Sequence, residues 1–172
     1  MNYAKIKTHD IANGPGVRVS LFVSGCTHRC PGCFNAEAWD FSYGEPFGVE
    51  AEEKILSALA PDYIKGFSLL GGEPLEDSNR AALVHLLEKI KKAYPQKTVW
   101  CYTGYDFDVD VRGRWKLDLD MSKMLEYIDI MVDGKFIEAL KSPALRFRGS
   151  ANQRIIDVKK SLEAASVVLW KE

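Results

Sequence analysis

The sequence has no apolar run that approaches the roughly 18 residues of a membrane-spanning helix. Its N-terminus, MNYAKIKTHD, lacks the apolar core of a signal peptide, so we expect a cytoplasmic protein that does not enter a membrane. It also lacks a charge excess, because 23 basic residues face 24 acidic ones with no long run of either sign. This balance does not favour direct binding of nucleic acid or of an anionic lipid surface. Because linkers, repeats and low-complexity segments are absent too, we expect one domain over residues 1–172.

Cysteine is scarce, with four residues in 172, and three of the four lie close together. A chain of this length buries roughly 70% of the surface of its unfolded state and does not need disulfides to fold. In a reducing cytoplasm, clustered thiols are more typical of metal or redox chemistry than of disulfides. Cys26, Cys30 and Cys33 therefore predict a metal or redox site. Cys101 lies inside an apolar strand pattern, which is typical of a small buried side chain.

Apolar, β-branched segments alternate with segments of helical periodicity along the chain. The expected strands are 18–23, 66–70, 98–102 and 129–132, with 154–158 and 166–170 as further candidates. The expected helices are 49–59, a long one capped by Asp77 or Ser78 and ended by Pro95, and a short one over 122–127. This alternation predicts an α/β fold with a mostly parallel sheet covered by helices. Because a closed (β/α)8 barrel takes about 250 residues, a barrel-like sheet in this chain would have to be incomplete and open.

Unusual residues follow each of the first four expected strands. GCTHRCPGC follows the first strand, GGEP the second, TGY the third and DGKF the fourth. The carboxyl ends of parallel strands lie at one edge of a sheet, and ligands bind at that edge. We therefore expect these four motifs to converge in space.

The C-x3-C-x2-C spacing lets three sulfur atoms turn toward one centre, and Gly32 relieves crowding between the last two cysteines. A four-iron cluster normally takes one thiolate at each of four corners, so three local thiolates would leave one iron open. The alternative is a structural zinc site with Cys101, His9 or His28 as fourth ligand, although the sequence lacks the second ligand pair common in such sites. Redox-active or unligated thiols are a further alternative. We expect His28 itself to be a solvated side chain of the loop.

Residues 69–75, LLGGEPL, end the second strand with two glycines, a carboxylate and a proline. Paired glycines let a ligand approach the backbone closely, and a carboxylate accepts hydrogen bonds from a cation. The C-x3-C-x2-C motif after one strand, followed by GGEP after the next, resembles the radical S-adenosylmethionine (SAM) superfamily. The resemblance implies an incomplete, open (β/α) barrel of radical SAM type with a mostly parallel curved sheet. It also implies a 4Fe-4S cluster on the three clustered cysteines, SAM on the open iron, and the amino group of SAM on the loop formed by Gly71, Gly72, Glu73 and Pro74.

The resemblance extends along nearly the whole chain. DIANGPGVRVSLFVSGCTHRCPGCFN, GGEPL, YTGY, VDGKF and RGSANQR stand in the order seen in activating proteins of anaerobic ribonucleoside-triphosphate reductases. This resemblance implies a radical SAM oxidoreductase that cleaves SAM to methionine and a 5'-deoxyadenosyl radical, with an electron from a flavodoxin-type donor. The radical would abstract hydrogen from a glycine near the C-terminus of the reductase and leave a glycyl radical. The alternatives are an activase of another glycyl radical enzyme, a small synthase of the 7-deazaguanine pathway and, outside the superfamily, a zinc-binding interaction module.

Other matching positions have less defined roles. Thr103 and Gly104, with Asp133 and Lys135, match motifs that line the SAM side of related activases. There Lys135 could neutralise the carboxylate of SAM, and Asp133 could be a polar or cation ligand. Many superfamily members have an aromatic residue before the last cysteine, where this chain has glycine, so adenine stacking would fall to Phe34. For GPG-x-R, residues 14–18, the choice between a structural turn and a functional role stays open. The basic, amide-rich RGSANQR, residues 148–154, could hold SAM or the incoming glycine loop.

Overall fold

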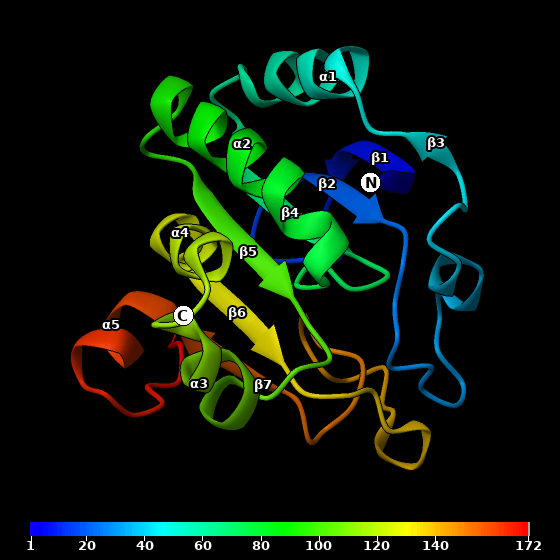
Figure 1. The fold of residues 1–172 in the computed structure, drawn as a ribbon, viewed down its shortest axis with the longest axis vertical. Helices are drawn as coiled ribbons and strands as arrows, with labels where there is room; N and C mark the ends of the chain where they lie inside the picture. The colour runs from blue at the N-terminus through cyan, green and yellow to red at the C-terminus, as the bar shows by residue number, and fades with distance from the viewer. Residues whose placement is uncertain (172) are drawn as a thin grey trace.

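The computed structural model describes residues 1–171, apart from the side chain of Trp115, and shows a seven-stranded α/β sheet (Figure 1). The strands are β1 Asn2–Asp10, β2 Val17–Val23, β3 Glu45–Pro46, β4 Ile64–Gly71, β5 Thr98–Tyr102, β6 Ile130–Asp133 and β7 Arg154–Asp157. The helices are α1 Val49–Leu59, α2 Asp77–Ala93, α3 Arg112–Trp115, α4 Leu119–Tyr127 and α5 Val158–Glu163. Short helical turns span Ala36–Trp39, Phe107–Val111 and Glu138–Leu140. Within residues 1–171, no helix has the length and apolar character needed to cross a membrane.

The strand order is β3-β1-β2-β4-β5-β6-β7, so the sheet is open, with β3 and β7 at its two edges. The central strands β2, β4, β5 and β6 are parallel, as expected from the alternation of strands and helices. The outer pairs are antiparallel. The strand expected at 154–158 is therefore present, but it runs against β6. The connection, residues 134–153, contains the short turn Glu138–Leu140 but no helix of the kind that usually forms the crossover between parallel strands.

Most expected elements appear near their expected bounds, and two expectations are wrong. The N-cap of α2 is Glu76, not Asp77 or Ser78, and its side chain makes no cap bond. That carboxylate instead accepts hydrogen bonds from the amide and hydroxyl of Thr27, at 2.8 and 2.6 Å. Residues 166–170 form no strand of their own but one bridge, between Leu169 and Ile156. The chain turns tightly after α5, so only the last residues of that segment reach β7.

Strand β1 was not expected from the sequence. Its residues, NYAKIKTHD, mix lysines with isolated apolar side chains and are mostly half-buried. It pairs antiparallel with β2 after a short connection. Three short helices were not expected either, because helical periodicity can be recognised only over about 11 residues. They span 36–39, 112–115 and 158–163.

The pleat of the central strands separates two environments. Leu21, Leu69 and Cys101 point toward the helices and are fully buried in the main apolar core. In Figure 1, α1, α2 and α4 cover this face of the sheet. The next residue of each strand points to the opposite face, because successive side chains alternate. Phe22, Leu70 and Tyr102 consequently line a cavity on the face away from these helices.

Candidate functional site

The motifs that follow the parallel strands converge, as the sequence predicts. The arrows of β2, β5 and β6 in Figure 1 point toward the same edge, where the following loops gather. A cavity of about 820 Å³ opens there. Each of the four strand-end motifs contributes to its wall; the contributing residues are Cys26, His28, Cys30, Cys33, Gly71, Gly72, Thr103, Gly104, Gly134 and Phe136.

Between its first and last cysteines, the cysteine loop has two residues of left-handed backbone conformation. Arg29 has φ of 46° and Gly32 has φ of 69°, and the amide of Cys33 donates to the carbonyl of Cys30 at 3.1 Å. A Cβ on Gly32 would lie 2.6 Å from the carboxyl carbon of Glu138, an exposed side chain that can move, so glycine is favoured here by its backbone angle. This tight turn allows three thiols from eight consecutive residues to face one cavity.

The sulfur atoms lie among backbone N–H groups. Burial raises the pKa of the Cys26 thiol to about 11, while the amides of His28 and Arg29 act in the opposite direction. The amide of Asn35 donates to the Cys33 sulfur at 3.4 Å. Amides directed at sulfur favour the thiolate form, and a soft metal displaces the remaining protons on binding.

The donor set fits an iron-sulfur cluster. Three cysteine sulfurs share one cavity, and thiolates are the ligands that iron-sulfur clusters take. Two of the three residues proposed as a fourth zinc ligand are engaged elsewhere: Cys101 is buried in the helix-side core, and His9 contacts Thr8 and Tyr63. The third, His28, lines the cavity, but its Nε2 lies 3.0 Å from the Glu73 carboxylate. Among residues 1–171, no three His, Cys, Asp or Glu side chains are gathered closely enough to count as a site for one metal ion.

Glu73 is fully buried and connects three of the strand-end motifs. Its Oε1 accepts hydrogen bonds from the amide of Leu75 and the hydroxyl of Thr103, at 2.8 and 2.9 Å. Its Oε2 accepts one from the amide of Gly104 at 2.7 Å and lies 3.0 Å from Nε2 of His28. The expectation that His28 is solvated is wrong, because its side chain is only 8% exposed and contacts this carboxylate.

The GGEP loop presents backbone to the cavity, while its carboxylate lies behind the wall. Gly71 and Gly72 line the cavity, and Pro74 is buried outside it. A Cβ on Gly72 would lie 2.6 Å from the carbonyl oxygen of Gly25, so this loop packs directly on the chain that leads into Cys26. Glycine at 72 is thus needed for the close approach of the two loops.

The structure places Asp133 and Lys135 apart from the other candidates. Asp133 is 1% exposed and accepts hydrogen bonds from the amide of Phe107, at 2.9 Å, and from Nε of Arg154, at 3.1 Å. The hydrogen bond to this carboxylate raises the pKa of Arg154. Lys135 is exposed, and its backbone carbonyl accepts a hydrogen bond from the Asn152 side chain. Between them, Gly134 lines the cavity.

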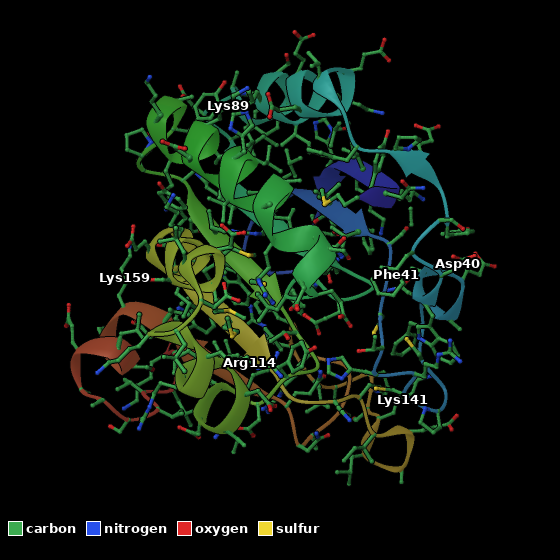
Figure 2. All side chains as sticks on the ribbon, in the orientation of Figure 1. Asp40, Phe41, Lys89, Arg114, Lys141 and Lys159 are labelled. Atoms are coloured by element: carbon green, nitrogen blue, oxygen red, sulfur yellow. The ribbon has the colours of Figure 1, made fainter. Side chains whose placement is uncertain are left out.

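Phe34 lies at the cavity wall and is 64% exposed. Its ring packs against Phe136 at 5.2 Å between centroids, and Nζ of Lys141 lies 4.5 Å from its centre. Figure 2 shows Lys141 on the same side of the molecule as Phe41. The sequence analysis did not select Phe136 or Lys141, although Phe136 belongs to the DGKF motif.

Of the two motifs of open role, GPG-x-R is structural at Arg18, whereas Arg148, Gly149 and Gln153 of the late motif line the cavity. Arg18 is fully buried and donates to the hydroxyl of Ser68 and to the carbonyls of Phe67 and Thr98, at 2.7, 2.8 and 2.9 Å. These bonds join β2, β4 and β5. In the late motif, Oε1 of Gln153 accepts from two amides of its own loop, and its Nε2 donates to the Gly134 carbonyl at 2.9 Å.

An open α/β sheet that brings three thiols to one cavity at its strand ends defines a candidate iron-sulfur protein, and residues 12–156 match the family described as 4Fe-4S single cluster domain. The chain is 43% identical to the anaerobic ribonucleoside-triphosphate reductase-activating protein of Vibrio cholerae, over 90% of this chain and 97% of that protein. It is 41% identical to that of Escherichia coli K12, over 89% and 96%. Identity to the protein of phage T4 is 39%, over 90% and 93%. The chain therefore belongs to the family of anaerobic ribonucleoside-triphosphate reductase-activating proteins.

Proposed function

We infer that this chain is a radical SAM activase of an anaerobic ribonucleoside-triphosphate reductase, built as a single domain with an incomplete, open barrel and acting in the cytoplasm. A 4Fe-4S cluster on Cys26, Cys30 and Cys33 would supply one electron to bound SAM, which would yield methionine and a 5'-deoxyadenosyl radical. Hydrogen abstraction from a backbone glycine near the C-terminus of the reductase would then give 5'-deoxyadenosine and a glycyl radical. A flavodoxin-type protein is the proposed electron donor.

The observation that carries this proposal is the single cavity shared by the three cysteines and the other strand-end motifs. Its volume of about 820 Å³ lies within the range of roughly 300 to 1,000 Å³ for ligand pockets. Its charged wall residues include Lys7, Lys141 and Arg148, which suit the carboxylate of SAM. These cations line the cavity, whereas Lys135 does not, so they are better placed for this role.

The polypeptide contributes position and shielding. Backbone groups of Gly71 and Gly72 would contact SAM, and Glu73 would keep Thr103, Gly104 and His28 in place around it. Phe34 and Phe136 form an aromatic wall suited to an adenine ring. Asp133 already pairs with Arg154, so its proposed part is to hold the β6 end of the wall.

Incubation of the anaerobically reconstituted protein with SAM, dithionite and the reductase tests this function. Electron paramagnetic resonance should show a glycyl radical on the reductase, with 5'-deoxyadenosine formed in the same reaction. A reductase whose target glycine is changed to alanine is the matched control and should show no such signal. Iron-loaded protein that forms no radical on the native reductase would refute the proposal.

A further inference from the structure

Trp39 ends the short helical turn Ala36–Trp39 and lies against the first loop cysteine. The amide of Gly25 donates to the carbonyl of Ala38 at 2.8 Å, and the amide of Cys26 donates to the carbonyl of Trp39 at 3.2 Å. These two bonds fix the turn beside the cysteine loop. Trp39 lines the 820 Å³ cavity together with all three loop cysteines.

The indole N–H of Trp39 is buried and has no hydrogen-bond partner among the described residues. A buried donor without an acceptor destabilises the fold, because it has lost its hydrogen bond to water. Most buried polar groups in native proteins are paired, and an exception calls for a specific explanation such as an absent ion or ligand. Because Trp39 lies in the wall of a sulfur-lined cavity, a group bound there is the candidate for the missing acceptor.

We propose that Nε1–H of Trp39 donates a hydrogen bond to a sulfur atom of the cluster and raises the reduction potential of that cluster. This inference rests on the cluster in the proposed function, and not on the glycyl radical. A cluster gains negative charge when it takes up an electron, so a donor to its sulfur stabilises the reduced form more than the oxidised form. The effect would ease one-electron reduction by a low-potential donor.

Trp39 also borders a second hollow of about 590 Å³, together with Cys26, Arg29 and Phe41. Solvent exposure affects a cluster's potential too, so the size of this side chain matters. A test must remove the N–H and keep an aromatic ring at this position.

Trp39→Phe does this in the cluster-loaded protein. We expect unchanged iron and sulfide per chain and a more negative midpoint potential in a redox titration. At a fixed donor potential, the ratio of reduced to oxidised cluster should fall about three- to tenfold, where tenfold corresponds to about 59 mV for a one-electron couple. Tyr43→Phe is the matched control, because it removes a hydroxyl that donates to Glu37 at 2.7 Å on the same segment but outside the cavity. It should leave the potential unchanged.

A second measurement needs no substitution. In native protein labelled with indole-¹⁵N tryptophan, pulsed electron paramagnetic resonance of the reduced cluster should show a ¹⁵N coupling, which Trp39→Phe should remove. Cluster-loaded protein with no such coupling, or a Trp39→Phe potential equal to that of the native protein, would overturn the inference. If Trp39→Phe does not retain iron, the labelled native protein decides alone. Protein that binds no cluster would instead refute the function proposed above.

Discussion

Cysteines on the two faces of the sheet lie in different environments. Cys101, on the helix side, is fully buried among apolar side chains, and burial raises the pKa of its thiol well above the ordinary value. Cys26, at the strand-end cavity, is nearly as buried, at 8% exposed, and burial raises its pKa too. Burial alone therefore does not mark a ligand. Cys26 differs in having backbone amides directed at its sulfur and open volume beside it.

This difference arises from a one-residue alternation along each strand. Leu69 and Cys101 face the helices, whereas Leu70 and Tyr102 face the cavity. Changes on the first face should therefore affect folding, and changes on the second should affect ligand binding. The following experiments test how cleanly the two faces separate.

The largest effect is expected at the cysteines. Cys26→Ala, Cys30→Ala or Cys33→Ala should each abolish the cluster and SAM cleavage, because each removes one of only three thiolates in the cavity. Cys101→Ala should keep iron content near that of the native protein. Iron and sulfide analysis after anaerobic reconstitution measures this. Equal loss of iron in all four variants would break the assignment.

The sequence predicted the central architecture because the apolar strands and long helices carry strong periodicity. α1 and β5 match their expected bounds, and the convergence of the strand ends followed from parallel topology. The sequence did not predict the direction of β7. That direction depends on residues 134–153, whose path is set by side chains such as Gln153 that bond to the backbone of their own loop.

At the site, the sequence indicated the shared position of the candidate ligands better than their surroundings. The cysteine spacing is a local property, and all three thiols reach one cavity. The partner of a buried polar group is a long-range property, so the contact between His28 and Glu73 and the anchoring of Thr27 by Glu76 were not foreseen. Trp39 lies only six residues after Cys33, but its unpaired N–H can be recognised only in three dimensions.

A pair of adjacent leucines gives the next largest effect. Leu69→Ala should lower the free energy of unfolding by about 2 to 5 kcal/mol, because it leaves a void in a closed core. Leu70→Ala should cost less, because its side chain already borders open volume. Anaerobic urea unfolding of both variants measures the difference. Equal losses would show that the two faces are not separate in energy.

Glu73→Gln should affect both faces. Its new amide group would meet the donating amide of Gly104, which now bonds to Oε2 at 2.7 Å. Loss of one charged hydrogen bond costs about 1.5 to 3 kcal/mol, and this cost falls first on the stability of the fold, because the Glu73 carboxylate lies behind the cavity wall. Because Thr103 and Gly104, which it holds, line the cavity, we also expect weaker SAM binding, with the cluster retained. Equilibrium dialysis with labelled SAM measures the change. Glu52→Gln is the control, because Glu52 pairs with Lys89 on the helix side, and unchanged binding in Glu73→Gln would contradict this role.

The smallest effect concerns Asp129, which precedes β6 at the edge opposite the cavity. Burial alone would raise its pKa, but hydrogen bonds from Lys159, Lys91 and the amide of Val99 lower it below the ordinary 3.8. Because the unfolded chain binds this proton more readily, the ionised carboxylate stabilises the fold above pH 4, and this contribution disappears as acid titrates the folded group. Asp129→Asn should cost about 1 kcal/mol at pH 7 and flatten the acid limb of a stability curve. The cluster absorption at pH 7 should stay unchanged, since no part of this ion pair lines the cavity. A curve of unchanged slope would show that the lysines do not perturb this carboxylate.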